Sequence, residues 1–553
     1  MTGAGAPWLA DVRVRGAEWL AGVSAAAAIV VILYLGRHLS FLYDEWTFAF
    51  VRRGADAQVF FGPHNEHWST LPVIIYRSLF RAVGLRHYLP YLAVLAVLHA
   101  GSALLLFKII RRRSGAALAL AGMILFLFLG RGAENMLWAF QVGFVGSVLC
   151  GLGATWLLDR GNASPFQRAL ASLSLVASLM FSGVGLFFCA AILVDLVLDP
   201  ARRRYLVTLT LPAAAYLAWF AIFGASGVSA HRSPLSLAAL LSLASYVPFG
   251  LGAAVAGLAG LSSRWGAASL ATAAVLVGIR WSQRGRIDSR MLGALAGVLS
   301  QFALTGLVRA QFGDEQAAAS RYVYVAAPFL LLLLTDALRD VRWEGFCRWV
   351  LAVGFALAVL NGGLQLRQFA HQRLAAVTIQ AAELETLSVF RDAPDLDRER
   401  LVDPVLPPIT AGQYFSAVEA LGSPVPSTDL GGLTRLPGAA VNQAMESVFA
   451  GALRVGGTSQ PAPASCQLFQ SASTVYVDRP VPSGGTVSLN GSAGGTASLW
   501  ISYLADPVGP PEQQVVLTPG SFTTVRLPDT GKPIDWNLRV ALPAAGTLSV
   551  CAG

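Results

Sequence analysis

Charged residues are scarce in this 553-residue sequence: Lys, Arg, Asp and Glu together make up 13% of it. Soluble domains usually carry about 25% charged residues, so one soluble globule of this length is not expected. A disordered chain is also excluded, because it needs low hydrophobicity, whereas 55% of these residues are hydrophobic. The composition therefore predicts a membrane protein with many spans and a soluble appendage.

Lysine is almost absent, since only Lys108 and Lys532 stand among the 40 basic residues. The formal charge of +9 would suit a nucleic-acid-binding protein, but the arginines occur in short runs between apolar stretches. Such runs are typical of membrane topology, so we expect no nucleic-acid partner. A positively charged side chain that contacts a phosphate group is therefore expected to be an arginine.

Apolar stretches long enough to cross a bilayer recur along the first two thirds of the chain. They predict about thirteen spans, near 18–36, 88–110, 115–130, 138–158, 169–183, 184–199, 205–224, 234–247, 248–262, 267–282, 290–309, 322–338 and 345–361. Between 234 and 262, Pro248 and several glycines leave a second reading open, a broken or re-entrant helix.

Arginine-rich loops fall on one side of these spans, which we assign to the cytoplasm. This orientation predicts a multi-pass protein of the plasma membrane with a cytoplasmic tail at 1–17 and a membrane domain at 18–361. The first outside loop, 37–87, and everything after Asn361 are then extracytoplasmic.

Residues 362–458 predict an extracytoplasmic connector, first helical and then Pro-rich. Residues 459–553 contain about eight short alternating runs separated by Gly, Pro, Asn and Asp. This spacing predicts an all-β sandwich of jelly-roll or immunoglobulin type.

The five cysteines divide between the two regions. Cys150, Cys189 and Cys347 lie in or beside apolar spans, where small buried side chains are expected. Cys466 and Cys551 lie at the first and last strands of the sandwich, and a disulfide between them fits an oxidising compartment.

The first outside loop is too apolar for a free loop and contains Asp44, Glu45 and the run His64-Asn65-Glu66-His67. We expect it to form amphipathic helices in the outer membrane interface, with Trp46 and Trp68 as interfacial anchors. Ionisable groups at this depth are costly, which favours a functional role for them.

The order of these features resembles the glycosyltransferase C superfamily, multi-spanning enzymes that use polyprenyl-phosphate sugars at the outer membrane face. The resemblance covers about two thirds of the chain and places the acidic motif of that superfamily at Asp44 and Glu45. Three further runs resemble an uncharacterised bacterial subgroup: residues 64–67, residues 134–141 from Glu134 to Gln141, and Ser320-Arg321-Tyr322.

The chemistry of sugar transfer explains why such residues are needed. A hydroxyl must lose its proton as it attacks the anomeric carbon, so Asp44, with Glu45 beside it, is the candidate general base. The departing phosphate needs cations, either arginine or a divalent metal. The candidates for binding the donor phosphate are Arg321, Arg309, Arg131, Glu134, His64, Glu66, His67 and Tyr322.

Each candidate has a structural alternative. The two acids can begin a helix, and the histidines can bind a metal or simply pack in the protein. Glu134 can pair with Arg131. The alternative role for Arg321 is to snorkel, extending its charged end to the membrane interface without binding a ligand. Metal dependence therefore stays open.

The sandwich resembles carbohydrate-binding modules of the same superfamily. Trp500, Tyr503 and Trp536 are candidates for stacking on sugar rings, although alternation along a strand allows each to be core.

The sequence therefore predicts an inverting membrane glycosyltransferase. It would move a pentose such as arabinofuranose, or mannose, from a polyprenyl phosphate to a cell-envelope glycan or lipid acceptor. The alternatives are a transporter or flippase of a lipid-linked sugar, and a non-catalytic scaffold that binds the cell wall. The sequence leaves sugar, acceptor and oligomeric state open.

Overall fold

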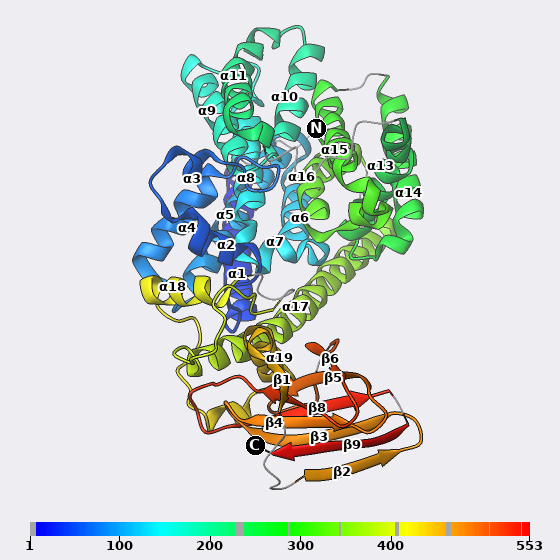
Figure 1. The fold of residues 1–553 in the computed structure, drawn as a ribbon. Helices are drawn as coiled ribbons and strands as arrows, with labels where there is room; N and C mark the ends of the chain where they lie inside the picture. The colour runs from blue at the N-terminus through cyan, green and yellow to red at the C-terminus, as the bar shows by residue number, and fades with distance from the viewer. Residues whose placement is uncertain are drawn as a thin grey trace. The chain divides into compact units, whose positions relative to one another are not determined.

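The computed structural model describes residues 7–226, 237–285, 288–341, 344–403, 409–459, 466–507, 509–543 and 545–552. The chain divides into two compact units (Figure 1). The first comprises Met1–Leu39, Arg52–Ala82 and Tyr88–Gln372, and the second comprises Ser40–Val51, Val83–His87 and Arg373–Gly553. The helical and β regions predicted from the sequence are both present.

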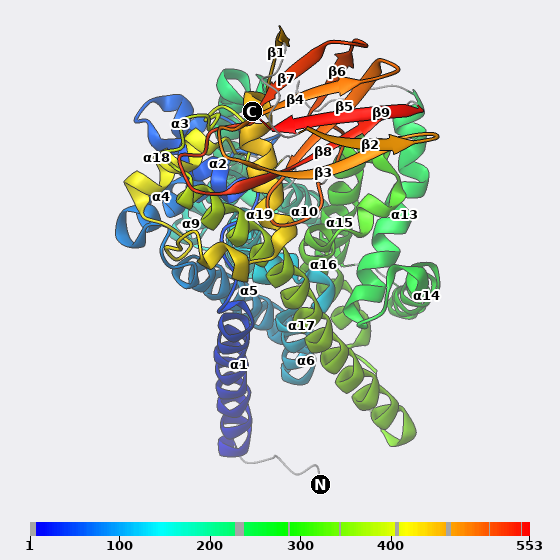
Figure 2. The ribbon, with the colours of Figure 1, turned by 60° about the horizontal axis from the view of Figure 1, so that its bottom comes forward.

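The first unit is a bundle of helices (Figure 2). Its α-helices are α1 (Pro7–Gly36), α3 (Ala57–Phe61), α4 (Thr70–Val83), α5 (Leu89–Ser114), α6 (Ala116–Leu127), α7 (Glu134–Leu137), α8 (Val142–Leu158), α9 (Pro165–Phe181), α10 (Gly185–Leu198), α11 (Thr210–Trp219), α13 (Leu237–Leu258), α14 (Gly266–Arg284), α15 (Ser289–Arg309), α16 (Ser320–Leu338) and the first part of α17 (Gly345–Val389). The short turns η2 (Gly130–Gly132) and η5 (Phe220–Gly224) also belong to it.

Local sequence signals explain several of these boundaries. Ser164 and Gln167 form a capping box around Pro165 at the start of α9. Asp288 caps α15, and Gly285 ends α14 with a φ of +64°, a conformation that glycine adopts without steric cost. Polar signals in short loops therefore set where these apolar helices begin and end.

Eight helices in the described part of the chain are long and apolar enough to cross a membrane. Helices α6 and α10 are apolar but shorter. Helices occupy the predicted positions, and the number of crossings stays a prediction. The predicted span 345–361 and the helical pattern that follows it are joined in one 45-residue helix, α17.

Helix α13 continues through Pro248, where the sequence allowed two spans or a re-entrant segment. In its first half, Ser245 donates a hydrogen bond to Asp314, in the loop between α15 and α16. Near its other end, a Cβ added at Gly257 would lie 3.0 Å from the side chain of Val323, in the first turn of α16. Both halves of α13 thus reach the same end of the bundle, which favours the re-entrant reading. Residues 234–236 of the predicted segment lie outside the described residues.

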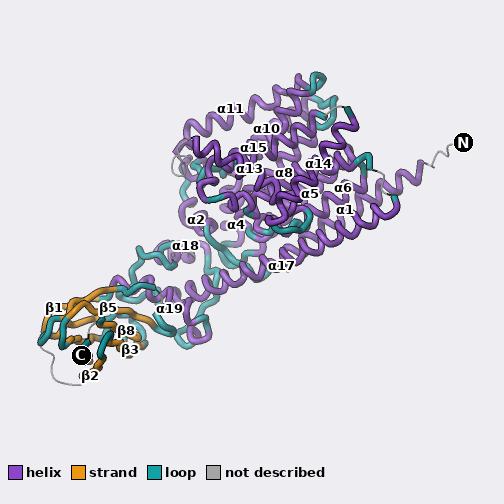
Figure 3. The backbone as a smooth tube through the Cα atoms, turned by 90° about the vertical axis from the view of Figure 1, so that its right-hand side faces the viewer, coloured by secondary structure: helices purple, strands orange, loops and turns teal. Residues whose placement is uncertain are grey.

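The second unit combines helices with a β-sandwich. Its helices are α2 (Asp44–Phe50), the last part of α17, α18 (Ala411–Leu421) and α19 (Gly438–Phe449). Its strands are β1 (Arg454–Ser459), β2 (Cys466–Ser471), β3 (Val475–Pro482), β4 (Thr486–Gly491), β5 (Gly495–Ser502), β6 (Gln513–Leu517), β7 (Phe522–Arg526), β8 (Asp535–Leu542) and β9 (Gly546–Ala552). Strand β1 falls in the predicted connector and was not foreseen. Figure 3 shows the strands of the described residues gathered in the C-terminal part of the chain.

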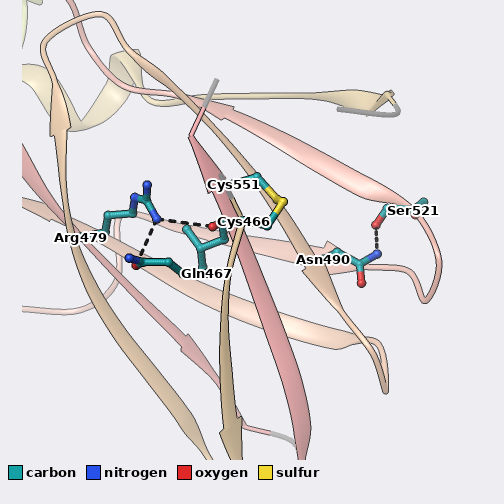
Figure 4. Close-up of a disulfide and its surroundings, with 7 residues drawn as sticks. Cys466, Gln467, Arg479, Asn490, Ser521 and Cys551 are labelled. Atoms are coloured by element: carbon teal, nitrogen blue, oxygen red, sulfur yellow. Dashed lines mark hydrogen bonds between the residues drawn. A yellow bond between two sulfur atoms is a disulfide. The ribbon is translucent and has the colours of Figure 1, made fainter. Parts of the chain in front are cut away.

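Two antiparallel sheets form the sandwich, with strand orders β1-β7-β4-β9-β2 and β3-β8-β5-β6. Cys466 and Cys551 lie directly opposite each other on β2 and β9 and form the predicted disulfide. Beside it, Arg479 donates hydrogen bonds to Gln467 and to the backbone carbonyl of Val550, the neighbours of the two cysteines (Figure 4). The covalent and polar contacts therefore hold the same pair of strands.

The expectation that Trp46 and Trp68 anchor the chain at the membrane interface is wrong, because protein groups enclose both rings. Trp46 is fully buried in the second unit and donates a hydrogen bond to Gln380 at 3.2 Å. Trp68, in the first unit, stacks on Trp219 with ring centroids 5.3 Å apart. Buried tryptophans need such partners for the ring and the indole N–H.

Candidate functional site

Two arginine–glutamate pairs form at the loop between α15 and α16. At the end of α15, Arg309 donates from Nη2 to Glu66 Oε1 at 2.8 Å. In the first turn of α16, Arg321 donates from Nη1 to Glu134 Oε1 at 3.0 Å. The fold thus joins residues from all three runs that the sequence analysis singled out.

The run from His64 to His67 forms a tight turn. The two histidines exchange backbone hydrogen bonds of 3.1 and 3.0 Å, which leaves Asn65 and Glu66 as the central residues. Asn65 has a φ of +52°, which asparagine tolerates better than most residues with a Cβ. The turn therefore determines the direction in which the Glu66 carboxylate leaves the backbone.

Arg52 fixes the chain just before this turn. Arg52 is 7% exposed, and its guanidinium donates to the carbonyls of Gln58, Val59, Gly62 and Pro63 at 2.8 to 3.2 Å. Arg52 belongs to none of the predicted site motifs, because four carbonyls that gather around one cation leave no motif in a sequence.

A cavity of about 280 Å³, which we call the Glu66 cavity, lies beside the first pair. Its polar lining residues are Glu66, His67, Tyr216, Thr305, Arg309 and Tyr322. The walls come mainly from apolar residues of α10, η5 and α15: Leu186, Phe187, Phe220, Leu304, Leu307 and Val308. The cavity therefore combines an ion pair with a surface suited to hydrocarbon.

Two polar atoms of this ion pair have no hydrogen-bond partner within the described residues. They are Nε of Arg309, a donor, and Oε2 of Glu66, an acceptor, and both are buried. Buried polar groups in folded proteins are nearly always hydrogen-bonded, so each exception needs an explanation. A ligand with a phosphate oxygen and a hydroxyl group would satisfy both.

Burial and neighbouring charges shift the pKa values of Glu66 and His67. Burial alone would raise the pKa of Glu66, but His67 and Arg309 outweigh it and hold this pKa below its ordinary value. Burial lowers the pKa of His67, although Glu66 acts in the opposite direction. Near neutral pH, Glu66 is therefore ionised and His67 neutral, able to accept one hydrogen bond and donate another.

Hydrogen bonds also position Glu134. Its Oε1 accepts from Gln141 Nε2 at 3.1 Å, and its backbone N–H donates to Ser320 Oγ at 3.1 Å. Asn135 in turn donates to Gln141 Oε1 at 3.4 Å. Asn135 and Gln141 were quoted in the sequence run without a role, and the structure makes them the support of Glu134.

Arg131 does not pair with Glu134, so that alternative is wrong. Its Nε donates to the carbonyl of Leu261 at 3.2 Å, while Glu134 pairs with Arg321 instead. Arg131 nevertheless lies at the same end of the bundle, because an added Cβ at Gly257 would lie 3.2 Å from the Arg131 side chain.

Asp44 and Glu45 belong to the second unit and begin α2. Glu45 is fully buried, and its Oε2 accepts a hydrogen bond from the backbone N–H of Leu42 at 2.9 Å. Asp44 is only partly buried. Tyr43, just before them, has a φ of +52°. In the described part of the chain, Tyr43 and Asn65 are the two non-glycine residues with positive φ, and each adjoins a predicted site motif.

The three aromatic candidates of the sandwich have different surroundings. Trp536 is fully buried, donates to the carbonyl of Pro528 at 3.0 Å and packs edge-on against Phe449, so the expected glycan contact is wrong for this residue. Trp500 and Tyr503 are partly buried. Burial raises the pKa of the Tyr503 phenol.

No group of three or more His, Cys, Asp and Glu side chains within the described ranges has a geometry that could hold a metal ion. Glu66 and His67 are adjacent, but Arg309 occupies one oxygen of the carboxylate.

No model of a known protein family matches the chain, and no curated protein does. Among solved structures, it is similar to ArnT from Cupriavidus metallidurans bound to undecaprenyl phosphate. The match covers 76% of this chain and 91% of that one, with 13% sequence identity and a TM-score of 0.48. Likeness at this level assigns neither a substrate nor a residue role to the present chain.

Proposed function

We propose that this chain is a membrane glycosyltransferase that takes a sugar from a polyprenyl-phosphate donor. The acceptor would be a glycan or lipid of the cell envelope at the outer membrane face. The observation that carries the proposal is the Glu66 cavity, with an unpartnered Arg309 donor, an unpartnered Glu66 acceptor and apolar walls.

A lipid-linked sugar phosphate has the three kinds of group that this cavity would satisfy. Its phosphate accepts hydrogen bonds from arginine, its sugar hydroxyls donate to a carboxylate, and its isoprenoid chain prefers apolar walls. We assign Arg309 and Arg321 to the phosphate and Glu66 to a sugar hydroxyl. His67 and Tyr322 border the same space and complete the candidate donor site.

In the proposed reaction, an acceptor hydroxyl oxygen attacks the anomeric carbon. The bond between that carbon and the phosphate oxygen breaks, and its electrons leave with the polyprenyl phosphate. The hydroxyl proton passes to a carboxylate, for which Asp44 is the candidate. Attack from the face opposite to the leaving group inverts the anomeric configuration. The arginines stabilise the negative charge that develops on the leaving phosphate.

Asp44 is preferred to Glu45 as the base because Glu45 is fully buried and its carboxylate already accepts the Leu42 N–H. Glu45 is then a positioning residue that holds the turn before α2. This division of labour refines the sequence prediction, which gave the two acids one role.

The outer face of the β3-β8-β5-β6 sheet is our candidate for contact with an acceptor glycan. On it, Trp500 lies opposite Arg539, which lies opposite Asp478 and bonds it at 2.7 Å. Tyr476, which the sequence analysis did not single out, is 68% exposed on the same sheet. Aromatic rings beside charged hydrogen-bonding groups suit sugar rings and their hydroxyls.

The proposal is tested with the full-length protein in membrane vesicles and labelled polyprenyl-phosphate arabinofuranose and polyprenyl-phosphate mannose. Asp44→Asn should lower turnover at least about 100-fold, because general base catalysis contributes about 10²–10⁴. Asp392→Asn, an exposed change in the same unit, is the matched control. Full activity of Asp44→Asn would remove Asp44 as the base.

The same vesicles separate the alternatives. Movement of lipid-linked sugar across the bilayer without a new glycosidic bond would support the transporter. A third result, loss of function on deletion of residues 459–553 but not on Asp44→Asn, would support the wall-binding scaffold.

A further inference from the structure

A second cavity, of about 430 Å³, lies among the C-terminal ends of α5, α8 and α16 and the beginning of α15. Arg112 and Met291 are among its lining residues, and we call it the Arg112 cavity. Five arginines and three aspartates line it, so its formal charge is positive. In the sequence, these arginines indicate only the orientation of the spans.

The two cavities lie at opposite ends of one helix. Met291 of the Arg112 cavity and Arg309 of the Glu66 cavity belong to α15. At 1.5 Å per residue, the rise between them is about 27 Å, close to the roughly 30 Å thickness of the hydrocarbon core. The Arg112 cavity therefore lies at the other membrane face, in the region of the lipid headgroups.

Each aspartate of the cavity already has partners. Asp159 pairs with Arg113 at 2.8 Å and with Arg290 at 3.5 Å. Asp336 pairs with Arg339 at 2.9 Å and also with Arg284 outside the lining. Asp288 accepts the backbone N–H of Arg290 at 3.0 Å and so caps α15. Arginine therefore pairs with two of the three carboxylates, and the third caps a helix.

Two lining arginines, by contrast, form no ion pair or hydrogen bond with a carboxylate in the part of the chain that the structure describes. Arg112 donates to the backbone carbonyl of Trp156 at 3.1 Å and lies over its ring. Arg160 is exposed and makes no hydrogen bond or ion pair to a described residue. The excess positive charge therefore resides on two guanidiniums that border one polar hollow.

We propose that the Arg112 cavity binds a phosphate group, supplied by the headgroup of an anionic phospholipid. Guanidinium groups match phosphate oxygens in charge and geometry. Basic pockets between transmembrane helices at one membrane face are known sites for such headgroups. Free phosphate shares this chemistry, but the position of the cavity at the span ends favours the lipid. A bound headgroup would tie α5, α8, α15 and α16 together at this face.

The test measures lipid binding to the full-length protein in detergent by native mass spectrometry. Cardiolipin and phosphatidylglycerol are compared with phosphatidylcholine. Arg112→Gln/Arg160→Gln should weaken binding of the anionic lipids at least tenfold and leave phosphatidylcholine unchanged. Arg203→Gln/Arg204→Gln is the matched control: both residues are exposed, follow α10 and lie outside the cavity lining.

Three outcomes decide the proposal. Selective loss in the Arg112/Arg160 variant supports it, and equal loss in both double variants overturns it in favour of general surface charge. A separate measurement, of inorganic phosphate binding in micelles without anionic lipid, tests free phosphate as the alternative ligand. If phosphate binds at the same arginines and anionic lipid does not, the headgroup assignment is overturned. Arg160→Gln alone disturbs no described contact, so it should bind less lipid even if the double variant fails to fold.

Discussion

Glu66 and Arg309 are separated by 243 positions in the sequence, yet they form a 2.8 Å ion pair in which each side chain keeps one buried, unpartnered polar atom. A purely structural ion pair gains most when all its donors and acceptors are satisfied. A donor and an acceptor that both lack a hydrogen-bond partner and lie beside one cavity instead indicate a ligand-binding site.

Replacement of Arg309 by Gln should reduce kcat/KM for the lipid-linked sugar by about 10- to 100-fold. A hydrogen bond to a charged group contributes about 1.5–3 kcal/mol, and the change also leaves Glu66 without its cation. Steady-state kinetics in vesicles would measure this effect. Arg264→Gln, an exposed arginine bonded to Ser262, is the control and should have wild-type kinetics. Wild-type kcat/KM in Arg309→Gln would remove Arg309 from the site.

The turn at Asn65 predicts a contrast between two substitutions. Asn65→Gly should retain activity, because glycine adopts the observed φ of +52° without strain. Asn65→Val should raise the KM for the donor, because a β-branched residue disfavours this conformation and would redirect Glu66. Donor KM values of the two variants measure the effect. Equal values would show that the turn does not position Glu66.

Glu45→Gln should lower the thermal stability of the protein. The buried carboxyl group accepts the Leu42 N–H, and glutamine replaces one acceptor oxygen by an NH2 group that this buried position would have to pair. We expect a loss of about 1–3 kcal/mol, observed as a lower Tm in scanning calorimetry. Glu399→Gln, at an exposed position of the same unit, is the control and should not change Tm. If Glu45→Gln leaves Tm unchanged but abolishes turnover, Glu45 is catalytic after all.

The Cys466–Cys551 disulfide should stabilise the pairing of β2 with β9. It closes a loop of 85 residues, and disulfides typically contribute about 2–4 kcal/mol to the stability of a domain. In the full-length protein, Cys466→Ser/Cys551→Ser should speed hydrogen exchange in these two strands. Cys150→Ser, a change at a free cysteine, provides the comparison. Identical exchange in both variants would contradict a stabilising role.

Glu512 makes the stability of the sandwich dependent on pH. Burial raises the pKa of this carboxyl from 4.5 to about 7, although its Oε2 accepts the Ile501 N–H at 3.2 Å. The folded protein thus binds this proton more tightly than the unfolded chain, so stability falls as pH rises from about 4.5 to about 7. Thermal unfolding of the full chain should show this decline, and Glu512→Gln should abolish its Glu512-dependent part. An unchanged pH profile in Glu512→Gln would refute the assignment.

The sequence by itself determined the elements and their class. Long apolar stretches form helices, because a segment inside a bilayer must satisfy its own backbone hydrogen bonds. Alternating runs between turn residues form strands. Cys466 and Cys551 likewise predicted the disulfide, because both lie in the sandwich and that region was assigned to an oxidising compartment. These features depend on local pattern, which a single sequence contains.

Tertiary structure alone decided which charges meet. The partner of Glu134 is Arg321, 187 positions away, and no local pattern distinguishes it from the nearer Arg131. Packing also buried Trp46, Trp68 and Trp536, because an aromatic ring in an apolar run suits a membrane interface, a sugar or a protein core equally well. The choice among these surroundings depends on contacts between distant segments, and only the folded chain brings such segments together.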